Sequence, residues 1–210
     1  MTRLLFLDRD GTLIEEPQPD QQVDSLDKLI FRPGAISTLA RLVRHTDFEL
    51  VLVTNQDGLG TAAFPEETFW PAHRMMLRVL ESEGVRFRTQ HIDRSLKHEN
   101  LPTRKPGTAM LQEYLTGGFD LARSYVVGDR LTDVELARRL GAQAIFLKNA
   151  SGMAAEAQPG LRLRHAEGIE YDPAGLLPHI ALVAESWSEI GQFLLAASPA
   201  PQAGGALEHV

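Results

Sequence analysis

Near its amino terminus the chain reads Leu4-Leu5-Phe6-Leu7-Asp8-Arg9-Asp10-Gly11-Thr12-Leu13. The apolar run before Asp8 predicts a buried strand, because a short apolar segment bounded by turn residues is typical of a strand covered on both faces. Asp8 and Asp10 then point to the same side of the chain. We interpret Asp8 as a nucleophile or metal ligand and Asp10 as its acid/base partner, since strand ends in α/β sheets open into ligand crevices. Taken alone, Asp-Gly would equally suit a surface turn.

The composition indicates one globular domain. The chain has 210 residues, 43% of them hydrophobic, and its net charge of -7 gives no overall basic field for a nucleic acid. It contains no cysteine, which excludes disulfides and thiolate metal sites. The apolar run at residues 4–7 is too short for a signal sequence or a membrane span, so we expect a cytoplasmic protein with no membrane partner. The sequence does not indicate an oligomeric state.

Strand and helix patterns alternate along the chain. Further strands are predicted at residues 50–53, 85–92, 124–128, 144–147 and 180–184, and helices at 36–43, 65–83, 108–115, 132–140 and 187–196. This alternation predicts an α/β fold with a Rossmann-like, doubly wound parallel sheet. We assign residues 1–196 to a single domain, with a candidate insert over 148–178 and a disordered tail over 197–210.

Reactive side chains follow several of the predicted strands. Thr54 and Asn55 end the second strand, Lys105 precedes a helix, and Asp129 ends the fourth strand with Asp133 close behind. Because the carboxyl ends of parallel strands meet at one edge, we expect all of them to share a crevice with the first motif. Taken singly, Lys105 would suit a protein surface, Thr54 a turn and Asp133 the first turn of a helix, where an acid favours the helix dipole. The combination of these residues is a more specific indication of a functional site than any one of them alone.

This set of side chains suits phosphoryl transfer. Mg²⁺ prefers oxygen ligands, which Asp8, the carbonyl of Asp10, and Asp129 would supply. The phosphate oxygens would be held by three groups that donate hydrogen bonds: Thr54, Asn55 and Lys105. Asp8 would attack phosphorus, Asp10 would protonate the leaving group, and Asp133 would orient Lys105 or the waters around the metal.

Four segments together resemble the signature motifs of the haloacid dehalogenase superfamily. They are Asp8–Thr12, Val53–Asn55, Arg104–Pro106, and Val127–Asp129 with Asp133. The resemblance implies a capless phosphatase core that uses Mg²⁺ and an aspartyl-phosphate intermediate. Five further segments are similar to the histidinol-phosphate phosphatase branch: Glu16-Pro17, Gln22–Asp24, Lys28-Leu29, Phe31–Gly34 and Asn55–Thr61. This second similarity implies hydrolysis of histidinol phosphate in histidine biosynthesis.

One loop departs from the pattern of these relatives. They often carry a zinc loop of three cysteines and a histidine just before the lysine motif, and the corresponding positions here hold Asp93, Ser95, Leu101 and Thr103. Neither Leu101 nor Thr103 replaces a thiolate ligand, so we expect no zinc. The sequence does not indicate what shapes this loop instead.

The expected substrate is a small phosphorylated metabolite. The segment between Thr54 and Lys105 is too short for a large cap domain, so the site should be open. We expect Glu16 to pair with the ammonium of histidinol phosphate and Arg104 to contact the substrate, although a loop glutamate is equally well explained as solvated. We expect Arg9 to be exposed.

Two alternative functions remain open from the residues. A heptose-bisphosphate phosphatase, or another small-metabolite phosphatase, is the alternative enzyme, and residues 55–60 favour the histidinol branch over it. A receiver-like phosphoacceptor domain is the alternative without an enzymatic role, because it too uses Asp, Thr, Lys and Mg²⁺. However, residues 50–53 carry no acceptor aspartate, and a long-lived phosphorylation has no need of the acid/base at Asp10. Turnover with release of phosphate separates the two.

Overall fold

The computed structural model describes residues 1–19, 21–148 and 175–198. Their strands form one parallel sheet in the order β3-β2-β1-β4-β5-β6. The strands are β1 (Arg3–Leu7), β2 (Phe48–Asn55), β3 (Phe87–Asp93), β4 (Tyr125–Gly128), β5 (Gln143–Leu147) and β6 (Ile180–Ala184). The predicted doubly wound parallel sheet is confirmed, including its short edge strand β6.

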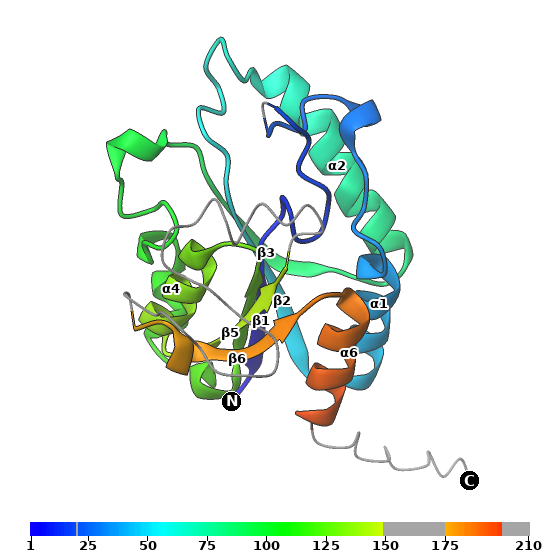
Figure 1. Cartoon of the computed structure of the whole chain (residues 1–210), viewed down its shortest axis with the longest axis vertical. Coiled ribbons are helices and arrows are strands. Elements are labelled where there is room, and N and C mark those ends of the chain that lie inside the picture. The colour runs from blue at the N-terminus through cyan, green and yellow to red at the C-terminus, as the bar shows by residue number, and fades with distance from the viewer. Residues whose placement is uncertain (20, 149–174, 199–210) are drawn as a thin grey trace, which may run out of the picture.

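Helices cover both faces of this sheet (Figure 1). They are α1 (Ala35–His45), α2 (Glu66–Ser82), α3 (Gln112–Leu115), α4 (Leu131–Leu140) and α6 (Trp187–Ala196). Side chains of α1, α2 and α6 pack with Leu5 and Leu7 in one core, while those of α3 and α4 pack with Leu4 and Phe6 in the other. Successive residues of β1 thus face opposite layers, as the alternation of a strand requires.

The third strand begins later than predicted. Val85 belongs to the turn that ends α2, because its N–H donates to the Leu80 carbonyl while the Gly84 N–H donates to that of Glu81. Gly84 adopts a φ of +82°, a left-handed conformation that ends helices and that glycine tolerates. A hydrophobic residue after such a glycine is common, and it imitates the start of a strand in the sequence.

The helix predicted over residues 108–115 is also shorter than expected. A 3-10 turn at Ala109–Leu111 leads into α3, which has only one turn. The Ala109 N–H donates to the carbonyl of Pro102, 3.0 Å away, in the preceding loop. The start of the segment is therefore hydrogen-bonded to that loop and does not begin an α-helix.

Two predictions lie largely outside the described residues: the insert over 148–178 and the disordered tail over 197–210. Both stay predictions, and so does the assignment of residues 1–196 to a single domain. Among the described residues, none of the helices has both the length and the apolar character needed to cross a membrane.

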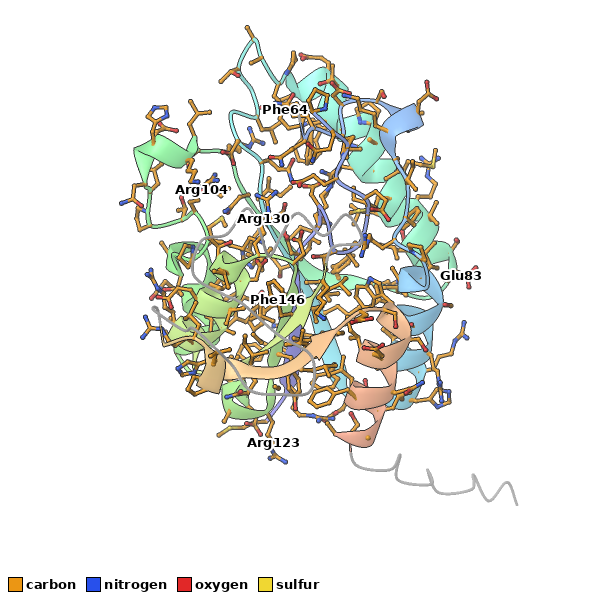
Figure 2. The ribbon with its side chains drawn as sticks, in the orientation of Figure 1. Phe64, Glu83, Arg104, Arg123, Arg130 and Phe146 are labelled. Atoms are coloured by element: carbon orange, nitrogen blue, oxygen red, sulfur yellow. The ribbon has the colours of Figure 1, made fainter. Side chains whose placement is uncertain are left out.

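The strand order brings the first motif to a favoured ligand position. All the strands run the same way, so their carboxyl ends lie at one edge, and the order of connections reverses between β1 and β4. Ligands of open α/β sheets bind at such a reversal. The Asp8 N–H donates to the Val127 carbonyl, 3.0 Å away, so that Asp8 and Asp129 emerge from neighbouring strands. Arg104 and Arg130 lie at this end of the sheet, and Arg123 lies at the other (Figure 2).

Candidate active site

A buried lysine joins two carboxylates at the ends of β1 and β4. The Lys105 Nζ lies 2.6 Å from an oxygen of Asp8 and 2.8 Å from one of Asp133. Burial alone lowers the pKa of the Lys105 ammonium, but the charges of Asp133 and Asp8 outweigh it and the pKa is raised. Lys105 is therefore a permanent cation at this point of the crevice.

Asp129 completes a compact group of carboxylates. One oxygen each from Asp8, Asp129 and Asp133 lie within 4.8 Å of one another. Burial raises the pKa of Asp8 to about 7, although Lys105 opposes the shift. Burial and the charges of Asp8 and Asp133 raise the pKa of Asp129 well above its ordinary value. The Oδ1 of Asp129 is buried and has no hydrogen-bond partner among the described residues, whereas Asp8 and Asp133 both contact Lys105.

Two glycines let the backbone approach these carboxylates. A Cβ at Gly11 would lie 2.3 Å from an oxygen of Asp129, and a Cβ at Gly128 would lie 2.2 Å from the Cγ of Asp133. Gly11 also has a φ of +73°, which other residues adopt at a cost. Any side chain at either position would displace the carboxylate group.

This arrangement fits a divalent cation. Hard cations take oxygen ligands and are bound through one or two carboxylates together with the substrate's phosphate. Asp8 and Asp129 would hold such an ion, as predicted from the sequence, and the unpartnered oxygen of Asp129 supplies a free ligand atom. Asp133 lies in the same group, although one of its oxygens already accepts from Lys105.

The helix that carries Asp133 starts one residue earlier than predicted. The sequence predicts its start at residue 132, but α4 begins at Leu131 with Arg130 as its N-cap. The second oxygen of Asp133 accepts from the Arg130 N–H at 3.1 Å. Because Asp133 stands at the third helical position, it caps the helix and holds Lys105 at once.

A second hydrogen-bond network surrounds Asp10. The Arg9 Nη1 donates to the two carboxylate oxygens of Asp10 at 2.8 and 3.1 Å, and the Gln56 Nε2 donates to one of them at 2.6 Å. The same amide lies 2.8 Å from the Thr54 Oγ1. Gln56 therefore links the proposed acid/base to the proposed phosphate-binding hydroxyl.

Arg9 is buried, and the expectation that it is exposed is wrong. Its side chain is 0% exposed, and its guanidinium lies 4.9 Å from the centre of the Phe69 ring. Phe69 belongs to α2, so this helix covers the Arg9 side chain. Burial of an arginine is tolerated here because Asp10 and an aromatic face both attract it.

Protonation of His73, beneath Arg9 on α2, is expected to weaken the fold in mild acid. His73 is fully buried, its ring stacks on Phe69, and its Nε2 lies 2.9 Å from the Gln90 Oε1. Burial lowers the pKa of His73 from 6.5 to about 4. Neutral His73 contributes its full share to the free energy of unfolding above the pKa of histidine in the unfolded chain. This contribution is lost as the pH falls toward the pKa of His73 in the folded protein. We expect a loss of up to about 3 kcal/mol, measured by denaturant titration at neutral pH and near pH 4.

Two histidine variants isolate this effect. His73→Gln removes the titrating ring and should lose less stability in acid than the wild type does. His45→Gln, at an exposed position on α1, should keep the wild-type loss. An acid sensitivity unchanged in His73→Gln would contradict the assignment.

Three predicted site residues are held by protein groups at the rim. The Asn55 side chain accepts from the Lys105 N–H at 2.9 Å and donates to the Lys105 carbonyl at 3.2 Å, so it holds that residue's main chain. Arg104 makes a double ion pair with Asp57 at 2.6 and 3.1 Å. Glu16 is paired with Arg130, and burial raises its pKa despite that partner. Glu16 thus lies near Asp129, whose pKa its charge helps to raise, whereas the Arg104 side chain pairs with Asp57.

Sequence reasoning missed several supporting residues. Gln56 follows a predicted motif directly, so its position beside Thr54 was a usable signal. Trp187 had no local signal: its Nε1–H donates to the Thr12 carbonyl, 2.8 Å away and distant in sequence. Trp187 is buried and belongs to α6, so the last described helix supports the loop after the first motif.

Comparison with known proteins shows similarity to one family of hydrolases. A family model described as HAD-hydrolase-like matches residues 102–169. The histidine biosynthesis bifunctional protein HisB of Spirosoma linguale is 50% identical over 194 residues, 92% of this chain and 49% of that protein. HisB of Bacteroides fragilis is 45% identical over 195 residues, 92% of this chain and 48% of that protein. The chain spans about half the length of the curated relatives it matches.

A solved structure agrees with this grouping. The D,D-heptose 1,7-bisphosphate phosphatase from B. bronchiseptica, complexed with magnesium and phosphate, has a TM-score of 0.72 and 27% identity, covering 94% of this chain and 100% of that one. These comparisons support the haloacid dehalogenase (HAD) superfamily of hydrolases, which the motifs of the chain predict. Within the superfamily the chain is similar to the HisB proteins at 45 to 50% identity, well above its identity to the heptose enzyme.

Proposed function

We propose that the chain is a Mg²⁺-dependent phosphomonoesterase with Asp8 as its nucleophile. The observation that carries this proposal is the contact of Asp8 with Lys105 beside the unpartnered carboxylate of Asp129. A cation held by Asp8 and Asp129 would neutralise a phosphate oxygen and keep Asp8 ionised despite its raised pKa. Lys105 and the Thr54 hydroxyl would bind other phosphate oxygens.

The reaction would proceed in two displacements. An oxygen of Asp8 attacks phosphorus, the ester P–O bond breaks, and Asp10 gives its proton to the departing alkoxide. Asp10 then takes a proton from water, which attacks the aspartyl-phosphate and releases phosphate. Arg9 and Gln56 hold the carboxylate of Asp10 in place for both proton transfers. Asn55 fixes the main chain of Lys105.

We further propose histidinol phosphate as the substrate, which places the protein in histidine biosynthesis and in the cytoplasm. Support comes from the identity of 45 to 50% to proteins named for histidine biosynthesis over 92% of the chain. Glu16, whose charge acts on Asp129 and whose carboxylate pairs with Arg130, would suit a small metabolite with a cationic end. The 27% identical heptose-bisphosphate phosphatase keeps that substrate as the second candidate.

Phosphate release from three esters tests the proposal. The purified chain is assayed with histidinol phosphate, D,D-heptose 1,7-bisphosphate and p-nitrophenyl phosphate, each with Mg²⁺ and with EDTA. We expect a kcat/KM for histidinol phosphate at least about 100-fold above the others, and no turnover with EDTA. A preference for the heptose ester would select the second candidate. Stoichiometric phosphorylation without turnover would favour a phosphoacceptor domain.

Glu16→Gln is expected to raise the Michaelis constant for histidinol phosphate about tenfold. The change removes a negative charge at the rim, and a hydrogen bond to a charged group is worth about 1.5–3 kcal/mol. The Michaelis constant for p-nitrophenyl phosphate, which has no ammonium, should stay unchanged. Glu15→Gln is the matched control, because Glu15 pairs with Arg32. An equal effect of Glu16→Gln on both esters would mean that Glu16 serves only Arg130.

A further inference from the structure

Asp93 is a buried carboxylate that the proposed chemistry does not use. It is the last residue of β3, it pairs in register with Asn55 of β2, and its carbonyl accepts from the Gln56 N–H at 2.7 Å. It is 4% exposed. A carboxylate at such depth requires hydrogen-bond donors, and the described residues supply them from the loop that follows.

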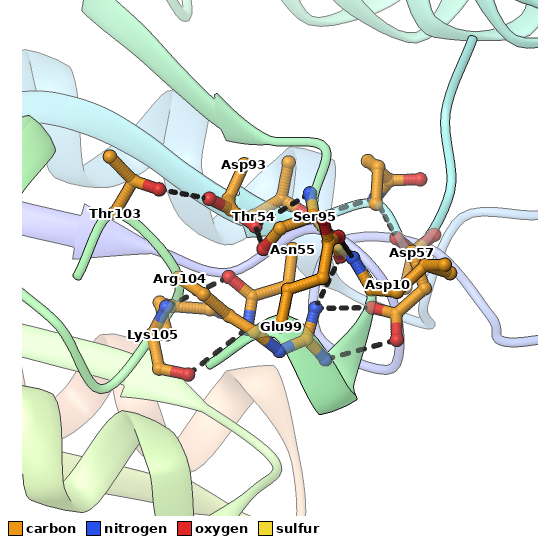
Figure 3. A network of polar contacts seen from close by, with 12 residues as sticks. Asp10, Thr54, Asn55, Asp57, Asp93, Ser95, Glu99, Thr103, Arg104 and Lys105 are labelled. Carbon is orange, nitrogen blue, oxygen red and sulfur yellow. Dashed lines mark hydrogen bonds and ion pairs between the residues drawn. The ribbon is translucent and has the colours of Figure 1, made fainter. Parts of the chain in front are cut away.

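Three donors from this loop converge on Asp93 (Figure 3). One carboxylate oxygen accepts from the Ser95 N–H at 3.0 Å and from the Ser95 hydroxyl. The other accepts from the Thr103 hydroxyl at 2.5 Å. Asp93 thus ties the beginning of the loop to its end and closes residues 94–104 into a ring.

These contacts join the positions where related proteins often carry a zinc loop. Asp93, Ser95 and Thr103 stand at three of the four corresponding positions. Leu101 at the fourth is 45% exposed. The hydroxyl groups of Ser95 and Thr103 donate to the carboxylate of Asp93. Hydrogen bonds between its own side chains therefore close the loop.

The closure bears directly on Lys105. Thr103 is only two residues before Lys105, and the intervening Arg104 donates to the Ser95 carbonyl at 3.0 Å. The Asn55 side chain then holds the Lys105 main chain from β2. The chain that delivers Lys105 is therefore fixed on both sides, and a shift of about 1 Å at a catalytic group can cost about 100-fold in rate.

We propose that Asp93, Ser95 and Thr103 form a carboxylate–hydroxyl clasp that closes the 94–104 loop and positions Lys105 in place of a metal. Asp93 and Thr103 are positioning residues, since neither touches the reacting atoms. The inference rests on the proposed phosphatase function for its kinetic readout alone. Closure of the loop is a property of the chain that needs no substrate.

Thr103→Val tests the clasp, because valine keeps the shape of threonine and removes the hydroxyl. We expect kcat/KM for the best ester to fall about tenfold, mainly in kcat. Trypsin should cut faster after Arg94 and Lys97, which lie in the loop. Thr103→Ser, which restores a hydroxyl, should recover both properties. His98→Gln, an exposed change in the same loop, should alter neither.

Asp93→Asn and a metal analysis complete the test. The amide that replaces the carboxylate accepts on one atom only, so this variant should show the same two losses while the purified wild type contains no stoichiometric zinc. A Thr103→Val variant with the wild-type trypsin cleavage rate and the wild-type kcat/KM would overturn the proposal. A Thr103→Val variant that is cleaved faster but keeps the wild-type kcat/KM would also overturn it. One zinc per chain, lost in the Asp93→Asn variant, would also overturn it. An inactive wild type would refute the phosphatase assignment, and the cleavage rates would still decide whether the clasp exists.

Discussion

Asp8→Asn is expected to abolish phosphate release while leaving the fold intact. The amide cannot attack phosphorus, and removal of a nucleophile costs about three orders of magnitude in kcat or more. Burial raises the pKa of Asp8 to about 7, so the folded state disfavours its charged form. Protonated Asp8 therefore contributes its full share to the free energy of unfolding below the pKa that Asp8 has in the unfolded chain. This contribution is lost as the pH rises through the pKa of Asp8 in the folded protein. Without a cation at about pH 8, the variant should therefore unfold at the same temperature as the wild type or higher.

Activity and thermal melting must be measured on the same preparations. Asp24→Asn is a matched control, since Asp24 is partly exposed and pairs with Lys28, and it should keep both properties. Residual turnover above about one per cent in Asp8→Asn would exclude Asp8 as the nucleophile. Loss of folding together with activity would contradict the sign of the pKa shift.

Lys105→Met is expected to damage both catalysis and stability. The methionine cannot bind a phosphate oxygen, which should lower kcat about 100- to 1000-fold. It also leaves Asp8 and Asp133 buried without their shared cation, and breaking a buried ion pair costs about 3–5 kcal/mol. Denaturant titration should show a larger deficit near pH 8 than near pH 5, because protonation of a carboxylate relieves the uncompensated charge in acid.

Lys28→Met provides the comparison. Lys28 is partly exposed and pairs with Asp24 four residues away, so its loss should change stability by no more than about 0.5 kcal/mol. If Lys105→Met were as stable as Lys28→Met, the ion pairs of Lys105 would contribute nothing. If it also kept its activity, Lys105 would have no part in the reaction.

The sequence was sufficient to predict the strands and the carboxylate group. Asp8, Thr54 and Asp129 each follow an apolar run directly, and the rule that parallel strands end at one edge brings such residues together without further information. The pattern also located β6 and α6 correctly. These features depend on residues that are contiguous in the chain, so the pattern of apolar and polar residues predicts them.

The supporting contacts were not predictable because each depends on a distant partner. The burial of Arg9 requires Phe69 on α2, and the engagement of Asn55 requires the main chain of Lys105. The Asp93 contacts require the loop to return to the end of β3. Only the packed structure determines whether a polar side chain meets solvent, a ligand or another residue.

The contact between Trp187 and the Thr12 carbonyl has a consequence for biosynthesis of the protein. Every residue proposed to take part in the chemistry lies within residues 8–133, so a ribosome has made all of them well before α6. Until Trp187 emerges, the carbonyl of Thr12 lacks its buried donor and β5 lacks its neighbour β6. Since domains fold as units during translation, a nascent chain should acquire activity only when α6 has left the exit tunnel.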